Sequence, residues 1–567
     1  MVDLHWLLSR LKGRKHHLCS VCARLDLERV FCNETSQQLI GSLSEYNDPA
    51  CPFCGLISKA IARAWGFKWD SASLYPVIEI SCQLFIQSRS PLSIKGHGGT
   101  KHPQPRLLLA TDKRPPAFHH NRAPPRQIDR EKRRFIVAEI EALPNRWEPN
   151  HLPRLDVGVH ANTTLLKRWL VECKRHEHSS REAKQGYNYL FQSELPFRLV
   201  DVKEECLVQK DKECDYLALS YVWGSLPTLN DPDEDEREIP VLLTLKKNMR
   251  DLESPKSLSS SRLVSHSTGR ISRTIRDAME FTRQMGMRYL WVDTLYIVQD
   301  DLYEKTRLIG NMDSIYNSAT ATIIAAAGSD ADAGLRGISP RTGHPIEPVK
   351  IVDASDGTVL NLSLCLLSLC EEVRSQTWYT RGWAFQEQCL SRRCFYFTGD
   401  EVFFNCSEAH WREGYDYATK MPKNSEVKVR TGPPWWSRNL RKDLDPTPYQ
   451  YLGDVSGEFS VHAYQAAVQE YSQKTLKFPH DIFDAFEGIF NRFRGSKSAL
   501  NLGIRQAQAI PPHLLYQAIL WFPSGRAKKR LGAPERVGQL ADQFSTWSWY
   551  VPFLWLKFRL DCYGEQV

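Results

Sequence analysis

The chain has 567 residues and a formal net charge of +8, which arises from 74 Lys and Arg residues against 66 Asp and Glu residues. With 42% hydrophobic and 25% charged residues, its composition is that of an ordinary globular protein, and its length is enough for about three or four domains. No apolar run reaches the roughly 18 residues that a membrane-spanning helix needs, so the sequence excludes an integral membrane protein. A basic cluster follows, rather than precedes, the apolar patch at residues 4–11, so we expect no signal peptide and a cytoplasmic location.

The fifteen cysteines are expected to be reduced inside the cell, and four of them form two C-x2-C pairs, Cys19 with Cys22 and Cys51 with Cys54. Each short loop aims two thiolates at one point, which is a recognised way to hold Zn2+ tetrahedrally. Four protein thiolates leave no open coordination position, so such a metal would be structural. The alternative is that Cys51 and Cys54 begin the apolar face of a helix at 55–65 and pack there as small buried thiols.

A strand is expected at 77–86, and the segment 87–134 that follows it is rich in Pro, Gly, Lys, Arg and His. This composition predicts a flexible loop or linker. A basic segment can bind a phosphate backbone, but here aromatic residues are few and Asp112, Asp129 and Glu131 dilute the positive charge. Nucleic-acid binding is therefore disfavoured.

From Phe197 onward, short apolar runs alternate with segments of helical periodicity. Alternation of strands and helices at this spacing predicts a parallel sheet with right-handed crossovers, and closely spaced pairs of apolar runs predict hairpins. The expected elements are strands at 216–222, 288–293 and 320–327, helices at 273–285 and 301–318, and hairpins at 199–209 and 394–406.

In an open parallel sheet, ligands bind outside the carboxyl ends of the strands. The residues at these positions should therefore approach one crevice. They are Tyr221, Trp223 and Gly224 after one strand, Asp293 after the next, and residues 328–330 after the third. The alternative is that the aromatic side chains belong to the core and that Asp293 only caps a turn.

Four segments, in this order and at this spacing, resemble the fungal heterokaryon incompatibility (HET) domain. They are Tyr216-Leu-Ala-Leu-Ser-Tyr-Val-Trp-Gly224, Tyr289-Leu-Trp-Val-Asp-Thr-Leu-Tyr-Ile-Val-Gln-Asp-Asp301, Met312-Asp-Ser-Ile-Tyr-Asn-Ser-Ala319 and Arg381-Gly-Trp-Ala-Phe-Gln-Glu387. The resemblance implies a role in fungal non-self recognition, in which fusion of incompatible cells triggers cell death. It also implies self-association or a partner incompatibility protein.

One position departs from the HET pattern. The family usually has Cys where this chain has Tyr296. A cysteine nucleophile at this position is therefore excluded.

The HET family is in turn similar to Toll/interleukin-receptor (TIR) domains, some of which cleave NAD+. This similarity implies a TIR-like fold, with NAD+ as the substrate and Glu387 as the catalytic residue. Breakage of the bond between nicotinamide and ribose passes through an oxocarbenium-like state that a carboxylate can stabilise or trap. On a helix, Trp383, Gln386 and Glu387 would share one face. A ligand there requires Glu387 to be partly accessible, with Tyr221 or Trp223 on the pocket wall.

Two alternatives to catalysis remain open. Trp383 can belong to the core while Glu387 pairs with Arg381, Arg392 or Arg393. The second alternative is that the domain is a non-enzymatic signalling or self-association module.

The expected fold class is α/β, with a parallel-sheet, TIR-like HET domain between a Cys-rich N-terminal module and a mainly helical C-terminal extension. The helices of that extension are expected at 461–475 and 481–493. The predicted organisation is a Cys-rich module at 1–86, a basic Pro-rich loop or linker at 87–134, a lead-in helix and strands at 135–215, the HET domain at 216–406 and the C-terminal extension at 407–567.

Overall fold

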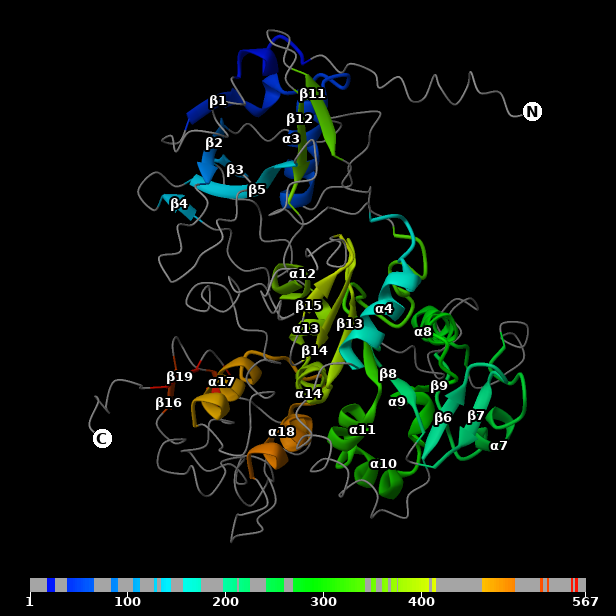
Figure 1. Cartoon of the computed structure of the whole chain (residues 1–567). Helices are drawn as coiled ribbons and strands as arrows, with labels where there is room; N and C mark the ends of the chain where they lie inside the picture. Colours follow the sequence, from blue (N-terminus) through cyan, green and yellow to red (C-terminus); the bar gives the residue numbers. More distant parts are fainter. Residues whose placement is uncertain are drawn as a thin grey trace, which may run out of the picture. The chain divides into compact units, whose positions relative to one another are not determined.

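The structure is a computed structural model of the chain, and its elements are labelled in Figure 1. It divides into two compact units, each described by itself: unit 1 comprises 1–156, 344–371 and 414–421, and unit 2 comprises 157–343, 372–413 and 422–567. The residues that the structure describes are 18–25, 38–65, 83–89, 106–112, 127–129, 134–143, 157–174, 197–211, 214–224, 241–259, 269–341, 348–352, 359–365, 369–374, 376–406, 410–414, 461–494, 521–523, 528–529, 552–553 and 556–558.

Unit 1 contains an antiparallel sheet with the strand order β1-β2-β3-β5-β12-β11, and β4 pairs with β5 outside this path. Two strands, β11 and β12, come from a segment more than 200 residues after β5 in the chain. The strands are β1 (Gln38–Ser42), β2 (Gln83–Arg89), β3 (Arg106–Thr111), β4 (Gln127–Asp129), β5 (Arg134–Leu143), β11 (Val349–Val352) and β12 (Val359–Leu364).

Helix α3 (Pro52–Trp65) packs against one face of this sheet. Successive side chains of a strand point to opposite faces, so the alternating pairs Leu84 with Ile86 and Leu107 with Leu109 supply apolar side chains to the same face. The helix completes this core with apolar side chains at helical spacing, among them Phe53, Leu56, Ile57, Ala60 and Ile61. Two short 3-10 helices, η1 (Cys22–Arg24) and η2 (Leu43–Glu45), belong to the same unit.

The prediction of a linker over 87–134 is wrong for its described part. Strand β3 lies within that range and pairs with both β2 and β5. Its sequence, Arg-Leu-Leu-Leu-Ala-Thr, is a short apolar run whose flanking basic and Pro-rich residues concealed it. The rest of that range, apart from the end of β2, Asp112, strand β4 and Arg134 at the start of β5, lies outside the described residues. So do residues 77–82 of the strand expected at 77–86.

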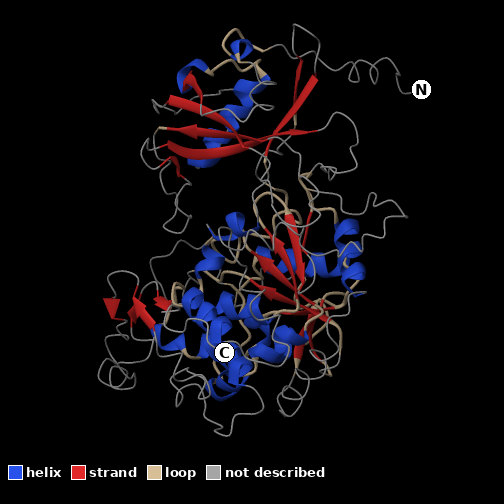
Figure 2. Cartoon of the chain, turned by 60° about the vertical axis from the view of Figure 1, so that its left-hand side comes forward, coloured by secondary structure: helices blue, strands red, loops and turns tan. Residues whose placement is uncertain are grey.

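Unit 2 contains an eight-stranded sheet with the order β15-β14-β13-β10-β8-β9-β6-β7. Figure 2 shows its strands with helices around them. The strands are β6 (Arg198–Asp201), β7 (Cys206–Gln209), β8 (Tyr216–Ser220), β9 (Tyr289–Trp291), β10 (Ala321–Ala325), β13 (Arg393–Phe397), β14 (Val402–Cys406) and β15 (His410–Arg412).

The expectation of a parallel sheet holds only for the four central strands, β9, β8, β10 and β13. The sheet as a whole is mixed, because β6 and β7 at one edge and β14 and β15 at the other pair antiparallel. Hairpin connections of a few residues can join only antiparallel strands, whereas parallel strands need longer crossovers. Both hairpins expected from the sequence are present, and they produce the antiparallel edges.

Helices cover both faces of this sheet. Phe395 and Phe397 of β13 pack edge-on against Phe281 of α8 (Arg273–Gln284). The intervening Tyr396 packs against Trp378 of α13 (Thr377–Thr380) on the opposite face. The helices beyond α3 are α4 (Thr163–Lys174), α7 (Met249–Leu252), α8 (Arg273–Gln284), α9 (Asp293–Tyr296), α10 (Leu302–Ile309), α11 (Met312–Ser318), α12 (Leu369–Arg374), α13 (Thr377–Thr380), α14 (Gly382–Leu390), α17 (Val461–Tyr471), η5 (Pro479–Ile482) and α18 (Asp484–Arg494).

Local signals set several helix ends. The Ser272 hydroxyl caps α8 by accepting a hydrogen bond from the Ile275 N–H at 3.4 Å, and Gly286, with φ of 77°, follows the end of the same helix. The single helix expected at 301–318 is instead two helices, α10 and α11, which are separated at Gly310 and Asn311. Tyr296, where the family usually has Cys, is 4% exposed and packs against Phe197 and Trp291.

The C-terminal extension is helical at α17, η5 and α18 but also contains strands. Strand β15 joins the main sheet, and two small antiparallel pairs form from β16 (Trp521–Pro523) with β19 (Leu556–Phe558) and from β17 (Lys528–Lys529) with β18 (Pro552–Phe553). Across the described ranges, every helix falls short of the length and apolar character required to cross a membrane.

Candidate functional site

Among the four parallel strands of unit 2, successive strands are added on one side of β8 and then on the other. In chain order β8 comes first, β9 lies on one side of it, and the chain then returns to place β10 on the other side. Open parallel sheets bind ligands outside the carboxyl ends of their strands at such a switch point. A ligand site is therefore expected beside the residues that follow β8, β9 and β10.

The loops after β8 and β10 approach each other at Gly224. Gly224 has φ of 75°, and a Cβ atom placed on it would lie only 2.9 Å from Cβ of Asp330. Both the backbone conformation and the close approach require glycine. The structure thus brings the predicted Gly224 to the switch point.

Asp293 follows β9 and begins α9. Its Oδ2 atom accepts a hydrogen bond from the Trp223 indole N–H at 2.9 Å, and its Oδ1 atom accepts one from the Thr294 backbone N–H at 2.7 Å. The Tyr221 hydroxyl lies 3.0 Å from Thr294 Oγ1. Tyr221 is buried, whereas Trp223 and Asp293 are partly exposed. The structure therefore brings Tyr221, Trp223 and Asp293 together.

Glu387 lies on α14 and meets the last residue of β8. The Ser220 hydroxyl donates a hydrogen bond to Glu387 Oε2 and accepts one from the Trp378 indole N–H at 2.7 Å. One donor and one acceptor fix the orientation of this hydroxyl. The expectation that Glu387 is partly accessible is wrong, because the residue is only 3% exposed beneath these contacts.

The two carboxyl groups share an unusual electrostatic environment. Burial, and after it the charge of Glu387, raise the pKa of Asp293 to about 7, against the lowering effects of the Thr294 N–H, Arg381 and Trp223. Burial also raises the pKa of Glu387, against the lowering effects of Arg381 and Ser220. An acid whose pKa is shifted to near neutral pH is a feature of functional sites.

Arg381 supplies the positive charge of this site. Its guanidinium donates a hydrogen bond to the backbone oxygen of Tyr221, which holds it at the end of β8. We call the following group the acid cluster: Ser220, Tyr221, Trp223, Asp293, Arg381 and Glu387.

Trp383 makes different contacts from Glu387, although both lie on α14. Its indole N–H donates to Asp481 Oδ2 at 3.3 Å, and its ring packs on the core formed with the C-terminal helices. Gln386 likewise accepts a hydrogen bond from the Gly488 N–H at 3.1 Å. The shared face expected for Trp383, Gln386 and Glu387 therefore meets different partners, and a role of Trp383 in substrate binding remains a prediction.

Sequence reasoning missed Ser220 and Trp378. Ser220 is the one small polar residue of β8 and ends its apolar run, and a polar residue in a fully buried strand requires a partner. That signal was present in the sequence. The position of Trp378 depends on how α13 crosses the sheet, which the sequence pattern does not specify.

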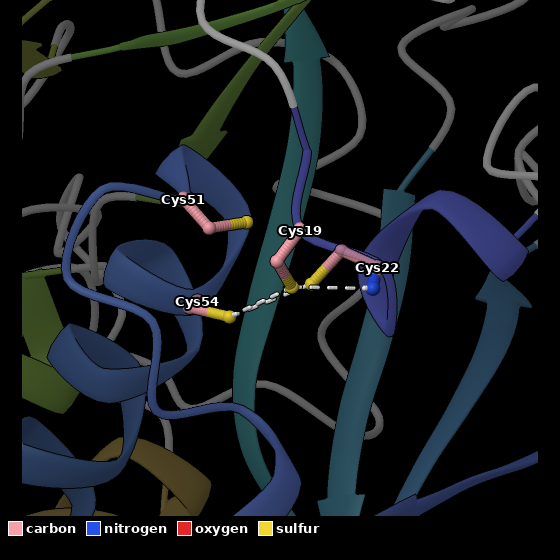
Figure 3. Close-up of side chains that lie close together, drawn as sticks. All are labelled: Cys19, Cys22, Cys51 and Cys54. Carbon is pink, nitrogen blue, oxygen red and sulfur yellow. Dashed lines mark hydrogen bonds between the residues drawn. The ribbon is translucent and has the colours of Figure 1, made fainter.

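A second candidate site lies in unit 1. Cys19 and Cys22 flank a turn that leads into η1, and Cys51 and Cys54 lie at the start of α3. The four sulfur atoms lie within 4.8 Å of one another and point toward one another, as Figure 3 shows. Cys54 Sγ is 3.7 Å from Cys19 Sγ and 3.5 Å from Cys22 Sγ. We call these four residues the Cys cluster.

The geometry of the Cys cluster is that of a group able to hold a metal ion. Hydrogen bonds to the Cys51 and Cys54 thiols, together with burial, raise the pKa of the Cys22 thiol. Four adjacent thiolates repel one another, so full deprotonation requires a cation among them. Cys51 and Cys54 also belong to the core around α3, so the helix-packing alternative describes the same residues without excluding a metal.

Comparison with known proteins bears mainly on unit 2. None of the curated proteins matches the chain, and neither does any solved structure. Residues 216–387 match the family model described as heterokaryon incompatibility protein (HET), and this span contains every member of the acid cluster. The chain therefore carries a HET domain at residues 216–387.

Proposed function

We propose that this chain acts in heterokaryon incompatibility in the cytoplasm and that its acid cluster hydrolyses NAD+, with cell death as the outcome. The HET domain supports the role in incompatibility. The observation that supports hydrolysis is the pair of acids with raised pKa values, Asp293 and Glu387, beside Arg381 at the switch point of the sheet.

The proposed reaction converts NAD+ and water into nicotinamide, ADP-ribose and a proton. As the bond from C1′ of the ribose to the nicotinamide nitrogen breaks, its electron pair leaves with nicotinamide and the ribose becomes cation-like. The Glu387 carboxylate would stabilise that cation. Asp293 would accept a hydrogen bond from a ribose hydroxyl, and Tyr221 or Trp223 would stack on a ring of the substrate.

This role requires Glu387 to become reachable. Its carboxyl is covered and bonded to Ser220, so the substrate must displace that hydrogen bond or open the site between α14 and the end of β8. Active-site hydrogen bonds often rearrange when the substrate binds. The proposed mechanism therefore includes a rearrangement that exposes Glu387 to the substrate.

The test is the loss of NAD+ in the presence of the purified full-length protein. Glu387→Gln should abolish that loss, because the amide keeps the shape of the side chain without its charge. Glu280→Gln is the matched control, since this side chain is 46% exposed on the outer part of α8. Equal rates for wild type and Glu387→Gln would refute hydrolysis at this residue.

A second function is favoured by the 3% exposure of Glu387 and by its hydrogen bond to Ser220. Here the carboxyl only stabilises the domain, which signals by associating with a second copy or with a partner incompatibility protein. In this case Glu387→Gln would still trigger cell death when expressed in fungal cells, without a fall in NAD+. Sedimentation of the purified protein over a range of concentrations would detect self-association.

A structural Zn2+ in the Cys cluster is a separate part of the proposal. The four thiols fit this ion, which prefers tetrahedral sulfur ligands at about 2.3 Å. Bound there, Zn2+ would compensate the charge of the thiolates and tie the turn at Cys19 and Cys22 to the start of α3. Metal analysis of protein purified without chelators should find about one zinc ion per chain, and protein with none would contradict the site.

A further inference from the structure

The match to the HET family ends at residue 387, but the helix that carries Glu387 is held by residues beyond it. The core around α14 contains Phe385, Cys389 and Leu390 together with buried side chains of α17 and α18. Gly488 of α18 lies so close to α14 that an added Cβ would meet Leu390 Cδ1 at 2.7 Å. The HET fold of this chain therefore includes C-terminal residues outside the matched span.

The segment 470–476 makes the closest contacts with the residues that lead into α14. It consists of the last two residues of α17 and the five residues that follow. The Thr475 N–H donates to the Thr380 backbone oxygen at 2.6 Å, and the Gly382 N–H donates to the Thr475 backbone oxygen at 2.8 Å. These two bonds bracket Arg381 from both sides. A Cβ atom on Gly382 would lie 2.5 Å from Leu476 Cδ2, so the Leu476 side chain packs directly against the backbone at Gly382.

A buried ion pair reinforces the same junction. Lys474 Nζ is 2.7 Å from Glu470 Oε1, and it lies 3.3 Å from the centre of the Tyr379 ring. The Tyr379 hydroxyl donates to Glu470 Oε1 at 2.6 Å. The Lys474 side chain is 4% exposed, so its charge depends on these partners. Loss of one member of such a group leaves the other buried and uncompensated.

The residues held in this way lead directly into the acid cluster. Trp378, next to Tyr379, donates to Ser220, which in turn donates to Glu387. Arg381, next to Thr380, donates to Tyr221. A shift of residues 378–381 would therefore move two groups at once. They are Trp378, the donor to Ser220, and Arg381, the cation of the acid cluster.

We propose that residues 470–476 position the acid cluster: by holding 379–382, they keep Arg381 on Tyr221 and Trp378 on Ser220. They are positioning residues, since they act through others. The effect on catalysis rests on the proposed NAD+ hydrolysis, whereas the effect on the geometry of the acid cluster does not.

The experiment compares Lys474→Met with Lys477→Met in the full chain. Methionine keeps most of the length and the apolar stem of lysine but removes the charge. Lys477 is an exposed lysine three residues further on, and it supplies the matched control. Two quantities are measured on folded protein: the kcat and KM for NAD+, and the pH titration of the Trp223 indole N–H by NMR, with its signal assigned from Trp223→Phe.

In Lys474→Met, we expect kcat to fall by roughly tenfold or more, because misplaced catalytic groups lose this much or more. The Trp223 signal reports the ionisation of Asp293, to which its indole is bonded. Arg381 lowers the pKa of Asp293, so displacement of Arg381 should move the titration midpoint upward. Lys477→Met should change neither quantity.

The outcomes separate the two proposals. If the wild type does not consume NAD+, the proposed hydrolysis fails, and the Trp223 titration still tests the positioning. An unchanged midpoint in folded Lys474→Met would overturn the positioning role. Should that variant fail to fold, Tyr379→Phe removes only one hydroxyl from the same junction, and an unchanged midpoint there would have the same meaning.

Discussion

The acid cluster and the Cys cluster differ in the source of the positive charge that can compensate their neighbouring ionisable groups. Both bring together groups, most of them buried, that repel one another when ionised. The acid cluster contains its own cation, Arg381, which lowers the pKa values of Asp293 and Glu387 against the effect of burial. The four members of the Cys cluster are all thiols, so if they ionise together, the compensating charge has to come from a bound cation. Tertiary structure thus supplies the cation of the first cluster, whereas ionisation of the second would require a ligand.

The largest expected effect is the loss of metal from the Cys cluster. Cys22→Ser should remove the zinc and unfold the core around α3, because structural zinc contributes roughly 10 kcal/mol of apparent binding free energy, comparable with the stability of a whole domain. Metal analysis and hydrogen exchange of α3 amides measure both effects. Cys214→Ser, at a half-buried thiol of unit 2, is the control. Full exchange protection of α3 in metal-free Cys22→Ser would show that packing alone holds the cluster.

The next effect concerns the pH dependence of unit 2. The unfolded chain loses the Asp293 proton near pH 3.8, whereas the folded chain holds it to about pH 7. Between these values the folded state binds more protons, so stability falls as the pH rises, by on the order of 2 to 4 kcal/mol after allowance for partial exposure.

Asp293→Asn should remove this dependence and be more stable than the wild type at alkaline pH. The Asn side-chain oxygen can still accept from Trp223 or Thr294, while the buried charge is gone. Urea unfolding across the pH range measures the difference. A wild type whose stability rises over the same range would contradict the raised pKa.

A smaller effect is expected where the acid cluster meets β8. Ser220→Ala leaves the Trp378 indole N–H and the Glu387 carboxyl without their shared partner, which should cost about 1 to 3 kcal/mol. The pKa of Glu387 should rise, because Ser220 lowers it. Urea unfolding with the exposed control Ser254→Ala tests the cost, and equal losses in the two variants would show that the hydroxyl makes no special contribution.

The two clusters also differ in how far the sequence could predict them. The Cys cluster follows from two short motifs, since the spacing within each pair fixes two sulfurs locally. Tyr221, Trp223 and Asp293 were found because strand ends can be read from apolar runs and parallel strands end at one edge. The burial of Glu387 was not foreseen, because it depends on how α13 and α14 cross the end of β8.

The sheet of unit 1 shows the same limit at the level of the fold. Strands β11 and β12 lie within the span of the HET match, yet β12 pairs with β5 of the N-terminal region. The alternating residues Leu360, Leu362 and Leu364 of β12 favour a strand. The local sequence does not determine which other strand it pairs with. A contiguous domain at 216–406 could therefore be proposed from the sequence, whereas the division of the chain required its tertiary contacts.

The smallest effect is expected for Tyr221→Phe, which removes only the hydroxyl beside Thr294 Oγ1. One hydrogen bond between neutral groups contributes about 1 kcal/mol, so the variant should lose roughly this much stability. Tyr303→Phe is the control, because Tyr303 is 73% exposed. The variant also separates two roles of the ring in the proposed reaction. Stacking on a substrate ring needs only the aromatic face, so KM for NAD+ should stay unchanged, and a raised KM at full stability would instead assign the hydroxyl to substrate binding.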